Sequence, residues 1–490
     1  MKVLLVCPAT PETFWSFKHA LRFVSKRAAF PPLGLLTVAA LLPGDWQVKL
    51  VDMNVNRLTD EDLRWADYVM VSAMIVHKES VSEIVTRCRA LGKAIIAGGP
   101  LFTTGHAAFP DIDHFVLGES EELMPQVVED MRRGTVRHAY TTSNRPDITR
   151  VPLPRWELID FRNYVTMSVQ FSRGCPFDCE FCDIIVMNGR IPRTKTPAQL
   201  VAELEDLRVR GWQDMVFVVD DNFIGNKRQA KALLREIIQW RTRTGAKMGF
   251  LTEASANLAD DAELCDLMVR AGFKKVFVGF ETPSLESLKE CRKLQNCSRD
   301  LVDTVKTLQR AGLEVMGGFI VGFDHDPKDI FKRQFEFIQR SGVVTAMVGL
   351  LTALPETRLY RRLVDEGRIE AETSGNNTQA AMNFRPILGR DFFVNGYRQL
   401  MKDLYKPRNY YRRIRTFLES HKPQGPRLRL SRADIQAFLK SLWLLGVWHR
   451  GRLAYWRFCI STLIRRPRLF PLAVEMAIIG HHFRRVANLL

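Results

Sequence analysis

Three cysteines within eight residues constrain this chain more than any other feature. Cys175, Cys179 and Cys182 follow the spacing Cys-x-x-x-Cys-x-x-Cys, so one short loop supplies three thiolates. A structural zinc ion takes four protein ligands, and a closed electron-transfer cluster usually takes four cysteines. Three thiolates leave one iron of a cubic 4Fe–4S cluster open to a substrate or cofactor. We therefore predict that these three cysteines bind such a cluster and that the loop is catalytic.

Length and composition indicate a globular protein of several domains. The chain has 490 residues, of which 46% are hydrophobic. Its nine cysteines are too few and too scattered for a disulfide framework. The apolar run at residues 3–7 is too short for a signal peptide. We therefore expect a cytoplasmic protein, because an exposed cluster also needs a reducing compartment.

The positive charge is concentrated at one end of the chain. The formal net charge is +17, and residues 391–490 hold 20 Lys or Arg against five Asp or Glu. Basic modules of this kind bind nucleic acid, acidic partners or anionic membranes. The basicity therefore belongs to a C-terminal module and not to the rest of the protein.

The first 140 residues alternate short buried strands with helices. This alternation predicts a doubly wound, Rossmann-like parallel sheet. The expected strands span residues 3–6, 48–51, 68–71, 94–97 and 114–117, with helices at 33–42, 80–91 and 119–131. Ligands of such folds bind at the carboxyl ends of strands, where Ser72, Gly98 and Gly99 stand. No Gly-x-Gly-x-x-Gly fingerprint follows the first strand, which argues against NAD.

A polar, proline-rich linker at residues 141–165 separates this region from longer β/α units at 166–370. Six strand–helix units predict a partial (β/α)6 barrel. The expected strands span residues 167–171, 215–219, 247–252, 274–280, 314–321 and 345–351. Chemistry in barrels collects at the carboxyl ends of strands, and the cysteine loop follows the first strand.

Polar residues follow several later barrel strands, and we interpret them as candidate cofactor-binding residues: Asp220, Asp221, Asn222, Glu253, Ser255 and Glu281. Two further candidates, Gly318 and Ile320, lie inside the expected strand 314–321, where glycines permit a close backbone approach and apolar residues could flank a flat base. Each has a plainer alternative. The first three residues could cap a helix, the carboxylates could form salt bridges within the barrel, and the last two could belong to an ordinary buried strand.

The cysteine spacing, with Gly174 and Phe181 beside it, resembles that of the radical S-adenosylmethionine (SAM) superfamily. The resemblance implies that SAM binds the open iron and that one electron from the cluster cleaves it to a 5′-deoxyadenosyl radical. It also implies that residues 220–222 contact the SAM amino group, although that motif is usually Gly-Gly-Glu. Glu253, Ser255 and Glu281 would contact the ammonium or ribose. Gly318 and Ile320 would flank the adenine.

The first 140 residues resemble the cobalamin-binding domain found ahead of many radical SAM domains. The shared features are Pro-Pro-Leu-Gly-Leu at 31–35, Gly-Gly-Pro at 98–100 and Gly-Glu-Ser-Glu-Glu at 118–122. The resemblance implies that Ser72, Gly98 and Gly99 lie beside cobalamin. The cobalt-ligating Asp-x-His-x-x-Gly signature is absent, and His77 more plausibly packs locally. The alternative is a Rossmann-like domain that binds no ligand.

The basic C-terminal extension, residues 371–490, is expected to be mainly helical after a loop at 374–378. Its arginines, together with Trp443, Trp448, Trp456 and Phe458, fit helices that lie on an anionic membrane. Solvated arginines on a helical cap are the alternative. Nucleic acid is less favoured, because no RNA-binding aromatic motif is present. No apolar run is long enough to predict a transmembrane span.

The whole arrangement resembles the subgroup that includes hopanoid methylases. It implies a cobalamin-dependent methyltransferase acting on an unactivated carbon of a small or lipid-like, hopanoid or isoprenoid, substrate, with flavodoxin or ferredoxin as electron donor. A cobalamin-dependent radical cyclase or rearrangement enzyme uses the same parts. A tRNA methylthiotransferase would need three cysteines in the N-terminal third, where only Cys7 and Cys88 stand. A binding module without turnover is the remaining alternative.

Overall fold

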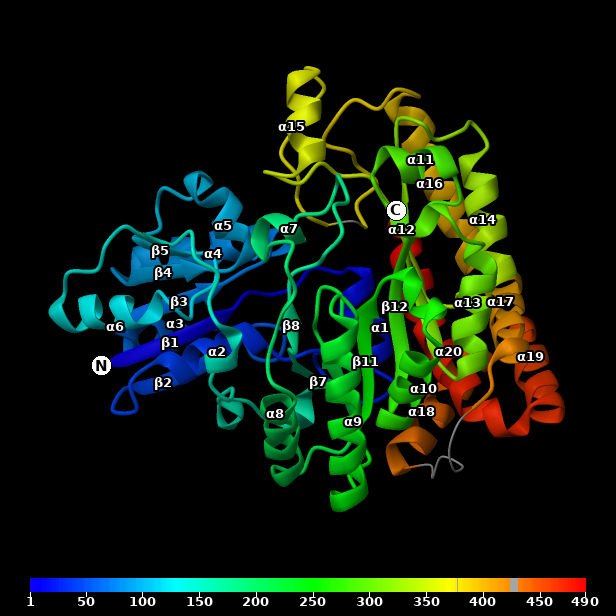
Figure 1. Ribbon diagram of the computed structural model, residues 1–490, viewed down its shortest axis with the longest axis horizontal. Coiled ribbons are helices and arrows are strands. Elements are labelled where there is room, and N and C mark those ends of the chain that lie inside the picture. The colour runs from blue at the N-terminus through cyan, green and yellow to red at the C-terminus, as the bar shows by residue number, and fades with distance from the viewer. Residues whose placement is uncertain (377, 424–430) are drawn as a thin grey trace.

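The computed structural model describes residues 1–376, 378–423 and 431–490. Two parallel sheets lie side by side, and a set of C-terminal helices packs against the second (Figure 1). The predicted α/β class, with a Rossmann-like sheet, a partial barrel and a helical extension, is therefore confirmed. The expected loop at 374–378 includes residue 377, which lies outside the described residues, as do residues 424–430 of the basic extension.

The N-terminal sheet has the strand order β2-β1-β3-β4-β5-β6, and all its strands are parallel. The strands are β1 Lys2–Cys7, β2 Gln47–Asp52, β3 Tyr68–Ser72, β4 Ala94–Gly98, β5 His114–Leu117 and β6 Ala139–Thr141. The five predicted strands are present. The sequence did not predict β6, which has only three residues and just one buried side chain. The predicted boundary at residue 140 falls inside β6, and the domain boundaries stay predictions.

Helices cover both faces of this sheet and create two separate cores. Helices α2 Leu33–Leu41 and α6 Met124–Arg133 pack on one face. Helices α3 Asp60–Trp65, α4 Lys78–Ala90 and α5 Pro100–Gly105 pack on the other. Side chains of β1 alternate between these cores, as the pleat of a strand requires. The helix predicted from residue 119 begins five residues later, because Glu119 and Glu121 turn toward the barrel.

In the barrel sheet, β7, β10, β11, β12, β13 and β14 pair in sequence order, all parallel, with β7 and β14 at its two edges. The strands are β7 Thr166–Val169, β10 Met215–Val218, β11 Gly249–Ala254, β12 Phe273–Glu281, β13 Glu314–Val321 and β14 Ala346–Leu350. The intervening helices are α8 Pro197–Val209, α9 Lys227–Thr244, α10 Ala262–Ala271, α11 Leu285–Glu290, α12 Leu294–Cys297, α13 Leu301–Ala311 and α14 Ile330–Ser341. The six predicted strands are therefore present, within a few residues at each end.

The cysteine loop has a small supporting structure that the sequence did not predict. Strands β8 Ser172–Arg173 and β9 Arg193–Thr194 pair antiparallel at its base. The short helix α7 Ile184–Met187 follows the last cysteine. The loop is thus an excursion of the chain between β7 and α8.

The C-terminal helices pack along the β14 side of the barrel (Figure 1). After α15 Arg358–Asp365, they are α16 Arg390–Tyr405, α17 Pro407–Ser420, α18 Arg432–Trp443, the π-helical turn η8 Leu444–Trp448, α19 Arg452–Arg465 and α20 Phe470–Ala487. Arg413 is fully buried and donates to the carbonyls of Leu404 (3.0 Å) and Val344 (3.1 Å). Part of the basic charge of this module is therefore structural. No helix in the described ranges is long and apolar enough to cross a bilayer.

The segment between β1 and α2 joins the three parts of the molecule. Phe14 stacks on Phe483 of α20, with ring centroids 5.2 Å apart. His482 Nε2 lies 3.1 Å from the carbonyl oxygens of Thr13 and Phe14. Trp15 reaches the barrel strands, where it contacts Phe277. This segment therefore seats the N-terminal sheet against both the barrel and the C-terminal helices.

Candidate active site at the carboxyl end of the barrel

Two carboxylates directly after β10, the buried Asp220 and the half-buried Asp221, hold the start of the cysteine loop. Asp220 accepts from the Phe171 N–H and the Ser172 hydroxyl, each at 2.7 Å. Asp221 accepts from the Gly174 N–H at 2.8 Å. Burial raises the pKa of Asp220 to about 7, although these donors act in the opposite direction. Both residues therefore position the loop, and their predicted contact with a cofactor stays a prediction.

Position 174 needs glycine because the loop folds closely around it. Its φ is +96°, and a Cβ atom there would lie 2.9 Å from the Gly189 carbonyl oxygen. The Cys175 N–H donates to that same carbonyl at 3.2 Å. Asn188 Nδ2 donates to Asp221 at 2.8 Å. The end of α7 therefore closes back on the residue that precedes the first cysteine.

Amide side chains face two of the three thiols. Asn222 Nδ2 lies 3.7 Å from Cys175 Sγ, and Gln295 Nε2 lies 3.8 Å from Cys179 Sγ. Burial raises the pKa of Cys179 and of Cys182, so neither thiol has the low pKa of an isolated reactive cysteine. Hydrogen bonds to sulfur are among the features that tune an iron–sulfur cluster.

The donor set of the loop fits an iron–sulfur cluster better than a single metal ion. Cys175, Cys179 and Cys182 are free thiols. Across the part of the chain that the structure describes, no three His, Cys, Asp or Glu residues gather as they would around one ion. A cubic cluster does not require the three sulfur atoms to surround a single point, because each thiolate binds a different iron. The three cysteines therefore match a 4Fe–4S cluster that leaves one iron without a protein ligand.

Polar groups from β10 and β11 gather beside Cys175. Asn222 Nδ2 donates to Ser255 Oγ at 3.2 Å, and Ser255 Oγ donates to Asn257 Oδ1 at 2.6 Å. Burial, followed by the charges of Asp221 and Asp220, raises the pKa of Glu253 to about 8. The predicted residues Asn222, Glu253 and Ser255 therefore come together near the first cysteine.

Glu281 ends β12 in a strained conformation, with φ +62° and a register shift beside it. Its carboxylate accepts from Lys293 Nζ at 2.7 Å. Burial alone would lower the pKa of Lys293, but Glu281 and Cys179 raise it, so this lysine is a fixed cation beside the cysteine loop. Glu281 thus forms a salt bridge within the barrel, which was the alternative to its predicted contact with a cofactor. Sequence reasoning missed Lys293 and Gln295, because they follow a helix and show no strand-end pattern.

The barrel interior is lined by aromatic rings next to the glycines of β13. A Cβ atom on Gly318 would lie 2.9 Å from Phe277 Cζ, so this glycine makes room for the ring. Trp15 lies parallel to Phe217, with centroids 6.2 Å apart, and 5.3 Å from Phe277. Ile320, two residues after Gly318, is partly buried. No sequence pattern predicted Trp15 at this place, because it enters the barrel from the connection between β1 and α2.

Small residues end the two central strands, β3 and β4, of the N-terminal sheet. Ser72 of β3 pairs with Gly98 of β4. Gly99 has φ +94°, and a Cβ atom there would lie 2.8 Å from Ser72 Oγ. His77 is buried, and both its ring nitrogens lie 3.2 Å from a partner, the Met74 N–H and Thr10 Oγ1. Burial lowers its pKa to about 4. The interpretation of His77 as a locally packed residue is therefore confirmed.

Ion pairs join the N-terminal sheet to the cysteine loop. Arg173, directly before Gly174, donates to Glu119 at 2.7 Å and to Glu121 at 2.6 Å. Arg193 of β9 donates to the other oxygen of Glu119 at 2.6 Å. Tyr164 of the linker also donates to Asp52 at the end of β2, at 2.9 Å. The two carboxyl edges therefore border the same region of the molecule.

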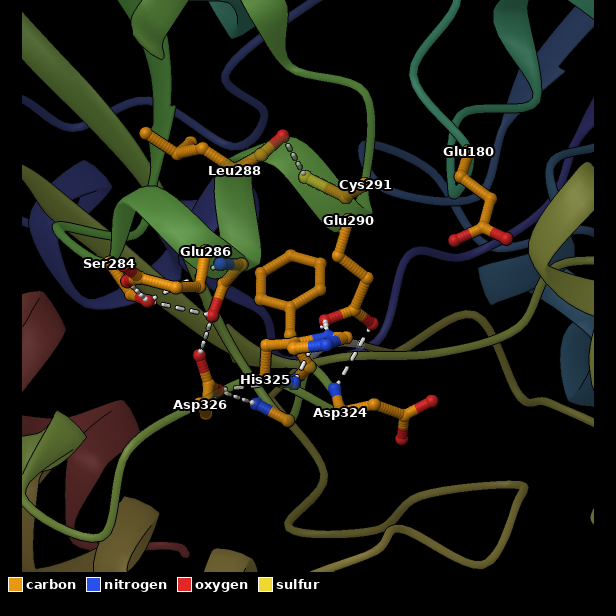
Figure 2. A network of polar contacts seen from close by, with 12 residues as sticks. Glu180, Ser284, Glu286, Leu288, Glu290, Cys291, Asp324, His325 and Asp326 are labelled. Carbon is orange, nitrogen blue, oxygen red and sulfur yellow. Dashed lines mark hydrogen bonds and ion pairs between the residues drawn. The ribbon is translucent and has the colours of Figure 1, made fainter.

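A second network, at the rim of the barrel, links α11 to the end of β13. Figure 2 shows Glu290 accepting from the backbone N–H groups of Asp324 (3.1 Å) and His325 (2.9 Å). Asp326 accepts from the Gly322 N–H at 2.7 Å. Glu180, between the second and third cysteines, connects to this network through Arg362 of α15, which donates to it at 2.7 Å. The outer side of the cysteine loop is therefore braced by three barrel segments.

Comparison with known proteins agrees with this site. Residues 169–338 match the radical SAM superfamily, and residues 357–490 match DUF4070, a domain family of unknown function. Two solved structures share the fold over most of the chain. Cobalamin-dependent SAM radical enzyme OxsB has a TM-score of 0.64 at 16% identity, covering 100% of this chain and 80% of its own. TsrM of Kitasatospora setae, a radical SAM methyltransferase, has a TM-score of 0.62 at 17% identity, covering 94% and 99%.

Curated relatives extend the similarity to the sequence of nearly the whole chain. An uncharacterised methyltransferase of Synechocystis sp. is 41% identical over 99% of this chain and 91% of its own length. The hopanoid C-2 methylase of Rhodopseudomonas palustris is 34% identical over 95% of this chain and 90% of its own. The chain therefore belongs to the radical SAM methyltransferase family that includes hopanoid C-2 methylase.

Proposed function

We propose that this protein is a cobalamin-dependent radical SAM methyltransferase that acts on an unactivated carbon of a hopanoid- or isoprenoid-like lipid. The observation that carries the proposal is the meeting of two carboxyl edges. One bears three free thiols and the polar side chains of Asn222 and Ser255. The other bears Gly98 and Gly99, and the Glu119 ion pairs join the two. The 34% identity to a hopanoid methylase supports the lipid class.

The cofactors would supply radical generation, from SAM at the cluster, and a transferable methyl group, from cobalamin. Cys175, Cys179 and Cys182 would hold the cluster, while Asp220 and Asp221 keep their loop in place. Asn222, Glu253 and Ser255 present oxygen acceptors that suit the ammonium and hydroxyl groups of SAM. Ser72, Gly98 and Gly99 carry no charged side chain and are half-buried, so their backbone would be the part of this edge that lies beside cobalamin.

The aromatic interior provides the dry surroundings that radical chemistry at a C–H bond needs. Trp15, Phe30, Phe217 and Phe277 contact one another, with ring centroids 5.3 to 6.3 Å apart. These rings would exclude water and match an apolar hydrocarbon skeleton. A one-electron donor such as flavodoxin or ferredoxin would restore the cluster between turnovers.

The test is a methyl-transfer assay on protein reconstituted without oxygen, with iron, sulfide, hydroxocobalamin and isotopically labelled SAM. Bacterial hopanoids in detergent serve as substrate. The expected result is a lipid product heavier by one labelled methyl group, together with 5′-deoxyadenosine. SAM cleavage that yields an isomerised or ring-closed lipid without the label would instead favour the rearrangement enzyme. A Cys175→Ala/Cys182→Ala variant controls for cluster-independent methylation.

We also propose that the C-terminal module places the enzyme on an anionic membrane, where a lipid substrate resides. An apolar face formed by α18, η8 and α19, hereafter the tryptophan face, is unusually exposed. Its large exposed side chains are Ile435, Leu439, Trp443, Leu444, Val447, Trp448, Leu453, Trp456, Ile460, Leu463 and Ile464. Contiguous exposed apolar surface of this kind marks an interaction site. Phe458, which was expected to join it, is buried against Tyr411 instead.

The charge around the tryptophan face selects an anionic bilayer as its occupant. Residues 435–474 contain no Asp or Glu. Their seven cations are Lys440, Arg450, Arg452, Arg457, Arg465, Arg466 and Arg468. Tryptophan at the headgroup level and arginine that reaches to lipid phosphates are typical of interfacial helices. Exposed leucine and isoleucine favour lipid over nucleic acid, which offers them no apolar phase.

Vesicle flotation of the full chain tests this contact. The protein should float with vesicles containing phosphatidylglycerol and stay in solution with pure phosphatidylcholine vesicles. A Trp443→Ser/Trp448→Ser/Leu453→Ser variant should lose flotation. The matched control, Val209→Ser/Leu285→Ser/Ile387→Ser, changes three exposed apolar residues elsewhere. Wild-type protein that ignores anionic vesicles would refute the contact, and the detergent-based methyl-transfer assay would still report on the chemistry.

A further inference from the structure

We propose that three exposed arginines over the cysteine loop form the docking surface for a small acidic protein that delivers one electron. They are Arg190, Arg292 and Arg358, hereafter the arginine rim. Their side chains are 56%, 53% and 44% exposed. They come from three separate segments of the chain, between α7 and β9, after α11 and at the start of α15.

All three arginines contact the stretch between the first two cysteines. Arg358 Nη1 lies 2.9 Å from Asp178 Oδ2, and Arg292 Nη1 lies 3.3 Å from the same oxygen. Arg190 donates to the Pro176 carbonyl at 3.4 Å. Three guanidinium groups therefore share one carboxylate, which leaves an excess of positive charge on the solvent side of the loop. An excess of this kind attracts and orients an acidic partner.

The arginine rim is held in place from below. The Leu359 N–H of α15 donates to the Glu180 carbonyl at 3.0 Å, and Arg362 donates to the Glu180 carboxylate. Arg362 and Arg368 both donate to Asp324, which Glu290 also anchors (Figure 2). These supporting ion pairs are largely shielded from solvent. They hold the backbone segments that carry the rim arginines, so the positive charges of the rim keep a fixed arrangement. A preformed surface lowers the entropic cost of docking.

The position of the rim fits electron entry. Asp178 directly precedes Cys179, and Gln295, three residues after Arg292, points its amide at the Cys179 sulfur. A carrier docked on the rim would thus be separated from the cluster only by the loop itself. Ile191 and Leu294, each within two residues of a rim arginine, are strongly exposed and supply an apolar contact. Small interfaces with charge and modest apolar area are usual for transient redox pairs.

The electron balance is simple. A reduced carrier, bearing a flavin hydroquinone or a reduced iron–sulfur centre, loses one electron, and the oxidised 4Fe–4S cluster gains it. No atom is transferred. The inference needs the cluster of the proposed function but not its substrate. The rim is also distinct from the tryptophan face, since α15 lies at the top of the molecule and α18 near its bottom in Figure 1.

The experiment compares two triple variants of the full chain. Arg190→Gln/Arg292→Gln/Arg358→Gln neutralises the rim. Arg228→Gln/Arg243→Gln/Arg270→Gln removes the same charge from exposed positions on α9 and α10. Binding of flavodoxin is measured by calorimetry at low salt. Reduction of the cluster is followed by stopped-flow absorbance, once with flavodoxin hydroquinone and once with dithionite.

The rim variant should bind flavodoxin about tenfold or more weakly and be reduced by it correspondingly slowly, since charge steering changes association rates by 10–10³. Its reduction by dithionite should be unchanged, and the control variant should match wild type in every measurement. Undiminished flavodoxin binding would overturn the proposal, and so would equal slowing with dithionite. If the triple variant loads iron poorly, Arg190→Gln decides instead, because the contacts of Arg190 with the loop are the longest of the three, 3.4 Å to the Pro176 carbonyl and 4.0 Å to Asp178.

Discussion

The two parallel sheets present carboxyl edges of opposite chemical character. The barrel edge carries Asp220, which is buried, and Asp221 and Glu253, which are half-buried, and donors already satisfy the first two. The centre of the N-terminal edge carries the uncharged residues Ser72, Gly98 and Gly99, and the buried carboxylate of Asp52 lies at the end of β2. Both edges belong to the same kind of fold, so the fold alone does not decide the ligand. The side chains suit a compact charged cofactor at one edge and a broad uncharged one at the other.

The largest expected effect is at the barrel edge. Cys179→Ala removes one of three thiolates, so we expect iron binding and 5′-deoxyadenosine formation to be abolished. The fold should persist, because a small buried side chain replaces another. Cys88→Ala, at a buried thiol under the N-terminal sheet, should leave both measurements unchanged. Iron analysis and product chromatography after anaerobic reconstitution check this. Continued 5′-deoxyadenosine formation by Cys179→Ala would remove the basis for distinguishing the two edges.

The next effect is at the N-terminal edge. In Gly99→Val the branched side chain must occupy φ +94° and meet Ser72 Oγ and the Ala73 backbone. Left-handed strain of this kind costs about 1–3 kcal/mol. Relief of this strain would displace the Ser72–Gly99 surface beside which cobalamin is proposed to lie. We therefore expect cobalamin binding, followed by absorbance, to fall at least about tenfold, which is equivalent to about 1.4 kcal/mol.

The same Gly99→Val variant should keep its full complement of iron, because the change is confined to the other edge. Gly44→Ala, at a position with open space around it, is the matched control and should bind cobalamin like wild type. Loss of iron together with cobalamin would show that the two edges are not independent.

The pattern of strands followed by polar residues was enough to predict much of the barrel edge. Asn222, Glu253 and Ser255 were found because each follows a recognisable strand, and strand ends converge in any parallel barrel. Lys293 and Trp15 were not found. Lys293 reaches the site from the segment after α11, and Trp15 reaches it from the connection between β1 and α2 of the other sheet. Neither contact can be predicted from the local periodicity of the sequence.

Sequence patterns also could not separate residues of one type that have different structural roles. The arginines of the C-terminal module look alike in the sequence, yet Arg413 is fully buried between Tyr405 and Tyr410, whereas Arg450 and Arg452 lie at the surface. The Asp220 and Asp221 carboxylates accept from the cysteine loop, which the sequence did not predict, while their predicted contact with a cofactor stays a prediction. Whether a side chain is buried, and which groups it bonds, depends on the assembled fold.

A smaller effect separates support of the loop from binding of a cofactor. Asp221→Ala leaves the Gly174 N–H and the Asn188 amide without their acceptor. Unpaired buried donors cost about 1–3 kcal/mol, so the melting temperature should fall. Iron should still bind, but less of it, because the cysteines remain. Ser72→Ala at the other edge is the control. A variant with normal stability but no SAM binding would instead assign Asp221 to the cofactor.

The last effect is a change of stability with pH, to which Glu253 of the barrel edge should contribute. Burial raises the pKa of Glu253 to about 8, whereas the unfolded chain keeps the ordinary value of about 4.3. The folded chain therefore binds this proton more tightly. Its contribution to stability is complete below about pH 4 and is lost as the pH rises through 8, by at most about 1.4 kcal/mol per pH unit.

Glu253→Gln copies the protonated form and should remove that slope. Denaturant unfolding of the iron-free chain at pH 4, 6 and 8.5 measures it. The variant should match wild type at the lowest pH and exceed it at the highest, because there the wild-type carboxylate is charged in a buried site. Ser72→Ala should leave the slope unchanged. Parallel curves for wild type and Glu253→Gln would mean that Glu253 is solvated, and the contrast between a charged and an uncharged edge would then rest on Asp220 and Asp221 alone.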